Sequence, residues 1–298
     1  MASFSSYIML TALKLLGIKK DFSQNPIDVN RVRKNDVLTI PKSLQKKYHW
    51  AQEKIAQCTV STFQPKTKQP SNKHILLIHG GAFISGPALH HWNTVDALMK
   101  LTNSTVSLID YPKAPEHNII AINRSIDSVY EHFVQTAPAT SYILLGDSAG
   151  ATLILTLVQR LVQEQKTLPV HLFPITPVCD ASITNPAIQS IVANDPMLHP
   201  DGVRSAKTMT AQDLPLKDPQ ISPLYGSFEN FPPATLFLGG RDILQPDGLL
   251  VAKKIQAAQV PLTLIDKSDM PHIWPILQPM YEARQALDQI AAIINALD

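Results

Sequence analysis

A single serine stands between two glycines in the segment ILLGDSAGATLIL. Gly146, Ser148 and Gly150 form a G-x-S-x-G pattern where an apolar, strand-like run meets a helix-like one. In this motif the serine occupies a strained turn that exposes its hydroxyl, and side chains at the glycine positions would collide with neighbouring backbone. The free N–H groups at the start of the helix suit a developing oxyanion. The pattern predicts a nucleophile at Ser148; an ordinary strand–helix turn is the alternative.

A serine hydroxyl is a weak nucleophile, so it needs a base, and the base needs an acid to orient it. With this motif the chain order is serine, acid, histidine. His272 follows the last strand-like run and precedes the last helix, at the same sheet edge as Ser148. It is the predicted base. His171 lies inside a strand-like run and is expected to be packed, whereas His199 lies in a proline-rich segment and could touch a ligand.

The orienting acid is expected after the fifth strand-like run. Asp242 stands directly beyond that run and is the predicted partner of His272. Asp247 is better explained as an acid in the first turn of the next helix. Asp180, at the end of another run, is a structural rival, and Asp269 is near the histidine in sequence only.

An oxyanion hole needs N–H donors aimed at the tetrahedral oxygen. Ala149, directly after the serine, is expected to supply one of them. The segment HGGAF, residues 79–83, follows another strand-like run and is expected to supply the rest, because its two glycines let the backbone approach a substrate closely. Read alone, the same glycines could form only a turn between a strand and a helix.

Strand-like and helix-like segments alternate along most of the chain, and continuous apolar runs are typical of strands buried on both faces. This alternation predicts an α/β fold with a mostly parallel central sheet flanked by helices. The predicted strands are 74–80, 105–111, 141–147, 170–175, 234–240 and 261–266, and the predicted helices are 88–102, 119–136, 149–165, 246–259 and 276–297.

Two segments interrupt the alternation: residues 1–50 and the proline-rich 178–225. We expect one α/β domain over residues 1–298, with these segments as a helical cap over the carboxyl edge of the sheet, where such folds place their ligand crevice. The apolar stretch 7–17 is too short to span a bilayer and is not a typical signal peptide. It predicts a helix packed on the protein's own body; a helix at a membrane surface or substrate entrance is the alternative.

Composition limits the classes of partner. The 298 residues carry a net charge of +2 with scattered basic residues, which argues against a nucleic-acid surface. Cys58 and Cys179 have no zinc-type spacing, so two reduced thiols in a cytoplasmic protein are expected. No metal or organic cofactor and no stable membrane insertion are predicted. A homo-oligomer is left open.

Two polar groups near the motifs receive structural interpretations. His90, His91 and Trp92 are expected to begin an ordinary surface helix, with a place at the site entrance as the alternative. Glu116 and His117 are expected to support a loop and not to take part in chemistry.

In chain order, the motifs HGGA, DYPKAPEH, GDSAG, DPQISPLYG, GGRDIL and MPHIW resemble those of hormone-sensitive-lipase-like bacterial carboxylesterases of the α/β-hydrolase fold. The resemblance covers the chain from about residue 70 onward. It implies a serine carboxylesterase with Ser148, Asp242 and His272 as the triad. It also implies a preference for short- to medium-chain acyl esters, and oxyanion donors at the positions of Gly81, Ala82 and Ala149.

The chain departs from that family pattern at two positions. Ala82 replaces the usual third glycine, and Pro112 replaces the usual arginine in the DYPKAPEH loop. The second change predicts that the loop is held in place by other contacts. An amidase or peptidase uses the same triad, and a catalytically silent ligand-binding protein could keep the same pocket, so both are retained as alternatives to the esterase.

Overall fold

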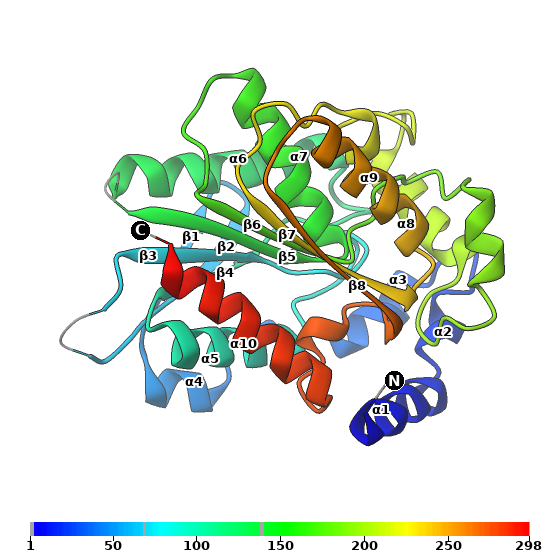
Figure 1. Ribbon diagram of the computed structural model, residues 1–298, viewed down its shortest axis with the longest axis horizontal. Coiled ribbons are helices and arrows are strands. Elements are labelled where there is room, and N and C mark those ends of the chain that lie inside the picture. The colour runs from blue at the N-terminus through cyan, green and yellow to red at the C-terminus, as the bar shows by residue number, and fades with distance from the viewer. Residues whose placement is uncertain (1–2, 68–69, 138–139, 298) are drawn as a thin grey trace.

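The computed structural model describes residues 3–67, 70–137 and 140–297. Within these residues, eight strands form one sheet in the order β1-β2-β4-β3-β5-β6-β7-β8 (Figure 1). Strands β3 to β8 pair in parallel, whereas β1 and β2 add an antiparallel edge. The strands are β1 His49–Ile55, β2 Cys58–Gln64, β3 Lys73–Ile78, β4 Thr105–Asp110, β5 Ser141–Asp147, β6 His171–Ile175, β7 Ala234–Arg241 and β8 Leu262–Pro271.

Helices cover both faces of the sheet, which confirms the predicted mostly parallel α/β fold (Figure 1). Successive strand residues alternate between two apolar cores: Leu77 belongs to one core and Leu76 to the other. Continuous apolar runs arise because both faces of each strand are buried. The first core includes α5 (Leu89–Thr102) and α10 (Tyr281–Ala296), and the second includes α6 (Ile119–Thr136), α7 (Ala149–Gln163) and α9 (Gln245–Ala257).

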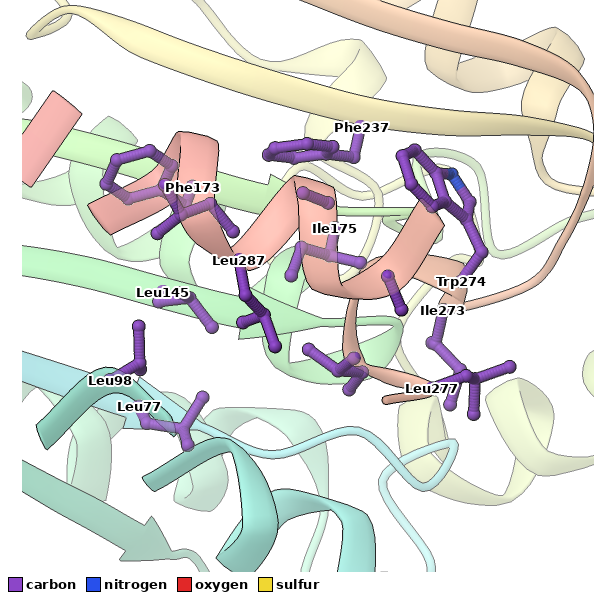
Figure 2. Close-up of a cluster of buried hydrophobic side chains, with 14 of the residues drawn as sticks. Leu77, Leu98, Leu145, Phe173, Ile175, Phe237, Ile273, Trp274, Leu277 and Leu287 are labelled. Atoms are coloured by element: carbon purple, nitrogen blue, oxygen red, sulfur yellow. The ribbon is translucent and has the colours of Figure 1, made fainter. Parts of the chain in front are cut away.

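The first core illustrates how the helices are fixed. Figure 2 shows Leu98 of α5 and Leu287 of α10 on the face formed by Leu77, Leu145 and other strand residues. This packing anchors the segment before α10, in which Trp274 is buried and donates a hydrogen bond to the Leu238 carbonyl at 3.0 Å. The loop between β8 and α10 is therefore held firmly at the carboxyl edge of the sheet.

The structure adds two strands to those predicted, extends the last predicted strand from residue 266 to Pro271, and divides the last predicted helix. Strands β1 and β2 were not predicted. For β1 the reason is that it lies at the exposed edge and its sequence, HWAQEKI, lacks an apolar pattern. The predicted helix 276–297 divides into a 3₁₀ turn, η4 (Trp274–Ile276), and α10. Pro275 and Pro279 explain the division, because a proline restricts its own backbone and that of the residue before it.

Both interrupting segments contain helices, and residues 178–225 also contain much irregular chain. Residues 1–50 contain α1 (Phe4–Leu16), α2 (Ile18–Asp21), α3 (Val29–Val32), η1 (Arg33–Asn35) and α4 (Lys42–Lys47). Residues 178–225 contain η2 (Pro186–Ser190), α8 (Pro200–Ala211) and η3 (Pro223–Tyr225).

One face of α1 packs on the protein, as predicted from its sequence. Leu10 and Leu13 are buried, and Glu282 of α10 accepts hydrogen bonds from the hydroxyls of Ser3 and Ser6. Its other face leaves Phe4 81% exposed. No helix among the described residues is both long and apolar enough to cross a bilayer.

Candidate active site

Ser148 lies at the sharp turn between β5 and α7. Its φ of 51° and ψ of −118° are strained for a residue with a side chain. The Ser148 N–H donates to the Ile175 carbonyl at 2.9 Å, which fixes the turn to the neighbouring strand. A Cβ at Gly150 would lie 1.9 Å from the carbonyl oxygen of Ile78, so only glycine lets α7 approach β3 this closely.

His272 and Asp242 form a buried pair at the same edge of the sheet. The His272 Nδ1 donates to Asp242 Oδ2 at 2.7 Å, and Asp242 Oδ1 accepts from the Leu244 N–H at 2.9 Å. Burial by itself lowers the pKa of His272, but the nearby carboxylates, Asp242 above all and then Asp195 and Asp147, together hold the pKa above its usual value. The ring is thereby fixed with Nδ1 turned to the acid, which leaves Nε2 for other chemistry.

A cavity of about 140 Å³ joins Ser148 to His272, since both side chains line it. Its other walls come from loops after β3 and β7 and from both interrupting segments. Residues 1–50 contribute Phe22, Val32, Asn35 and Asp36, and residues 178–225 contribute Val178, Leu198, Val203 and Lys207. The cavity therefore occupies the crevice at the carboxyl ends of the strands, the usual ligand site of open α/β sheets.

The segment after β3 turns its backbone toward this cavity. Gly81 has a φ of +119° and Ala82 a φ of 57°, and both line the cavity. In the part of the chain that the structure describes, no acceptor pairs with their N–H groups, whereas the Gly80 N–H donates to Asp147 at 3.0 Å. Ala149 is the first residue of α7, where N–H groups have no partner within the helix. Ala149 is fully buried beside Ser148 and does not itself line the cavity.

The DYPKAPEH loop supports this segment from behind. The Tyr111 ring stacks on His79 with ring centroids 4.4 Å apart, and its hydroxyl donates to the His79 carbonyl at 3.0 Å. Both rings are buried. The loop therefore positions the backbone that leads into Gly81.

Arg33, from the N-terminal segment, ties the two loops together. Its guanidinium donates to the carbonyls of Ile84 at 2.8 Å and Ala114 at 2.9 Å, and it pairs with both oxygens of Glu116 at 2.7 Å. This contact explains how the loop tolerates Pro112 in place of arginine. It also gives Glu116 a structural contact, as expected from its sequence position.

His90 and His91 do not lie on an ordinary surface helix, so that prediction was wrong. The first turn of α5 faces the cavity, and both histidines line it. His91 Nε2 lies 3.2 Å from Asp147 Oδ1, and its Nδ1 accepts from the Ala88 N–H at 2.8 Å. Trp92 is anchored below the turn by donating to the Val37 carbonyl. Polar residues at the start of a helix look exposed from sequence alone, which explains the error.

Asp147 completes this polar group. Burial by itself raises its pKa, but His91, His90 and the Gly80 N–H together outweigh burial and lower the pKa to about 2. One ligand atom each from His90, His91 and Asp147 lies within 4.8 Å of the others, a spacing that a metal ion could accept. The hydrogen bonds of His91 and Asp147 already explain why these two groups are adjacent.

The rival acids have other partners. Asp180 accepts from the Tyr225 hydroxyl at 2.7 Å, and Asp247, in the first turn of α9, accepts from the Asn185 amide at 2.7 Å. Asp269 is partly exposed. Only Asp242, among the four acids considered, is hydrogen-bonded to His272 in the described structure.

The other two histidines lie away from the cavity. His171 is buried within β6, as predicted, and its Nε2 lies 3.0 Å from the Thr235 hydroxyl. His199 precedes α8, where its Nδ1 accepts from the Asp201 N–H at 3.4 Å, and it is not among the residues that line the cavity.

Two residues near the site were missed by the sequence analysis. Asp195 accepts from the Ile243 N–H at 2.9 Å and so links the 178–225 segment to the loop that carries Asp242. Lys207 of α8 is fully buried and lines the cavity. No motif marks either residue, because both lie in a segment without regular strand–helix alternation.

Comparison with known proteins identifies the family. A sequence model of the α/β-hydrolase fold matches residues 75–276. An esterase from Acinetobacter venetianus is 30% identical over 236 residues, which cover 78% of each chain. The chain belongs to the α/β-hydrolase fold family. The match confirms the resemblance predicted from the motifs.

Further relatives of this α/β hydrolase are similar over most of their length. The esterase LipU of Mycobacterium tuberculosis is 28% identical over 233 residues, covering 76% of this chain and 78% of the relative. Among solved structures, a hormone-sensitive lipase from a metagenome library superposes with a TM-score of 0.83 at 22% identity and 98% coverage of both chains. At that identity the structural likeness bears on the fold alone.

Proposed function

We propose that this α/β hydrolase is a serine carboxylesterase that cleaves short- to medium-chain acyl esters through an acyl-enzyme. The observation that carries the proposal is the 2.7 Å contact between His272 and Asp242 beside a cavity that Ser148 shares. The relatives named as esterases support the same reaction.

In the proposed mechanism, His272 takes the proton from Ser148 as the hydroxyl attacks the ester carbonyl. Asp242 keeps the imidazole oriented and stabilises its cation. The N–H groups of Gly81, Ala82 and Ala149 receive the oxyanion, and the loss of one such donor is expected to cost about 2.7–4 kcal/mol of barrier. The protonated His272 gives its proton to the leaving alcohol, and the neutral imidazole then takes a proton from the water that attacks the acyl-enzyme and releases the acid.

The two interrupting segments are proposed to act as the cap of a single hydrolase domain. Each supplies apolar side chains to the cavity wall, among them Val32 and Leu198. An apolar wall suits the alkyl part of an ester. The free, buried thiols of Cys58 and Cys179 support the proposed cytoplasmic location.

Replacement of Ser148 tests the proposal. Ser148→Ala is expected to lower kcat for p-nitrophenyl butyrate by about 10⁶-fold, because the nucleophile is lost. Ser190→Ala removes an exposed serine outside the cavity and is the matched control. Near wild-type turnover by Ser148→Ala would refute the assignment of the nucleophile. A wild-type enzyme that cleaves the matching butyryl anilide faster than the ester would favour an amidase.

A further inference from the structure

Lys207 is an unexplained charge in the cavity wall. It lies on α8, its side chain is 0% exposed, and it lines the cavity that contains Ser148 and His272. Among the residues that the structure describes, no acceptor is hydrogen-bonded to its Nζ. Nζ lies over the ring of Phe83, 3.9 Å from the ring centroid. An ammonium buried without an acceptor is costly, so its presence requires an explanation.

The carboxylates of the cavity do not neutralise Lys207. Asp36 accepts from the Gly86 N–H at 2.7 Å, and Asp147 is paired with His91. Burial accordingly lowers the pKa of Lys207 to about 7. The contact with Phe83 partly stabilises a cation, but an aromatic face accepts no N–H···O hydrogen bond from the three donors of an ammonium.

We propose that Lys207 binds a carboxylate carried by the substrate, so that the preferred substrates are esters with a second, anionic group. This inference rests on the proposed esterase function and adds a substrate class to it. A substrate carboxylate would supply the missing charge and accept charge-assisted hydrogen bonds from Nζ. A neutral substrate would leave the buried amine unpaired, which is how a polar group in an apolar pocket discriminates between ligands.

A purely structural role explains the residue less well. The neighbouring side chains of the cap, such as Val203 and Leu198, are apolar, and a methionine would fill the same space without burying an unpaired donor. Because Lys207 lines the same cavity as the proposed nucleophile, its ammonium group can contact a substrate bound there.

Four esters test the proposal in two isosteric pairs. In the first pair, monomethyl glutarate carries a carboxylate on the acyl side, and methyl 5-methylhexanoate is its neutral isostere. In the second pair, carboxymethyl butyrate carries the carboxylate on the alcohol side, and isobutyl butyrate is its neutral isostere. We expect wild-type kcat/KM to favour the carboxylate ester by at least about tenfold in one pair, and that pair identifies the side that faces Lys207.

Lys207→Met is expected to lower that preference ratio at least about tenfold, toward the neutral isostere. Lys217→Met is the matched control, because Lys217 also lies over an aromatic ring but not in the cavity, and its ratio is expected to equal that of the wild type. An unchanged ratio in Lys207→Met would overturn the proposal. If Lys207→Met does not fold, the wild-type kcat/KM ratios test the proposal by themselves. A preference of the wild type for the neutral ester in both pairs would overturn the proposal.

The outcomes separate this inference from the esterase proposal. Hydrolysis of the neutral esters without preference for either carboxylate ester would leave the esterase function standing and refute the role of Lys207. Failure of the wild type to hydrolyse any of the four esters would refute the esterase function and, with it, the inference that rests on it.

Discussion

At the scale of single residues, the environment of His272 sets the pH at which the site can work. The imidazole must be neutral to accept the proton of Ser148, and the nearby carboxylates, Asp242 above all, hold its pKa above the usual value against the effect of burial. We therefore expect kcat/KM for a neutral ester to fall as the pH drops through a midpoint above about 6.5. A pH–rate profile of the free enzyme measures this midpoint.

Asp242→Asn provides the contrast to that profile. The variant loses the carboxylate that raises the pKa and is expected to hold the wrong tautomer, so kcat falls by on the order of 10⁴-fold. Asp247→Asn is the matched control, since Asp247 is an acid bonded to Asn185 and not to His272. A wild-type midpoint below 6, or an equal loss of kcat in both variants, would contradict the roles assigned to His272 and Asp242.

The residues at strand ends could be predicted because the motif and the chain order restrict the choices. Ser148 lies in a pattern that requires a strand–helix turn, and His272 is the one later histidine between the last strand and the last helix. Lys207 could not be predicted, because its burial depends on how α8 packs against residues distant in sequence, such as Phe83.

At the scale of elements, the N-terminal segment stabilises the proposed oxyanion loop through Arg33. Arg33→Met removes the hydrogen bonds to the carbonyls of Ile84 and Ala114 and the pair with Glu116. We expect kcat/KM to fall at least about tenfold, because a small displacement of the donors weakens stabilisation of the oxyanion. Kinetics with p-nitrophenyl butyrate and a thermal melt would measure the effect.

Lys34→Met is the control for that experiment, because Lys34 is an exposed neighbour in the same turn. Equal kinetics for Arg33→Met and the wild type would mean that the loop keeps its shape without the arginine. A fall in melting temperature without any loss of kcat would assign Arg33 to stability alone.

At this scale, some strands could be predicted from the sequence and others could not. Strands β3 to β7 follow from short apolar runs, because burial on both faces leaves little room for polar side chains. Strand β1 has six exposed residues out of seven, so its sequence carries no such signal. Strand β1 forms because its backbone pairs with β2 at the edge of the sheet, and not because of an apolar pattern in its own sequence.

At the scale of the whole molecule, the cavity exists only because distant parts of the chain meet over the sheet. Val32 comes from the N-terminal segment and Leu198 from the segment after β6, and both face the edge that carries Ser148. Sequence patterns predicted the two segments but not the cavity's dimensions, because these depend on packing between them.

The size of the cavity predicts an acyl-chain limit. A volume of about 140 Å³ is close to that of a cavity known to hold one benzene molecule, so acyl groups of about six carbons are expected to fill it. We expect kcat/KM in a series of p-nitrophenyl esters to peak at or below six carbons and to decline with longer chains. Leu198→Ala shortens a side chain of the wall, so it enlarges the cavity and is expected to move the peak to longer chains. Leu250→Ala, at an exposed site outside the cavity, is the control and is expected to leave the peak unchanged. A wild-type enzyme that hydrolyses the sixteen-carbon ester as well as the four-carbon ester would show that the cavity does not limit the acyl chain.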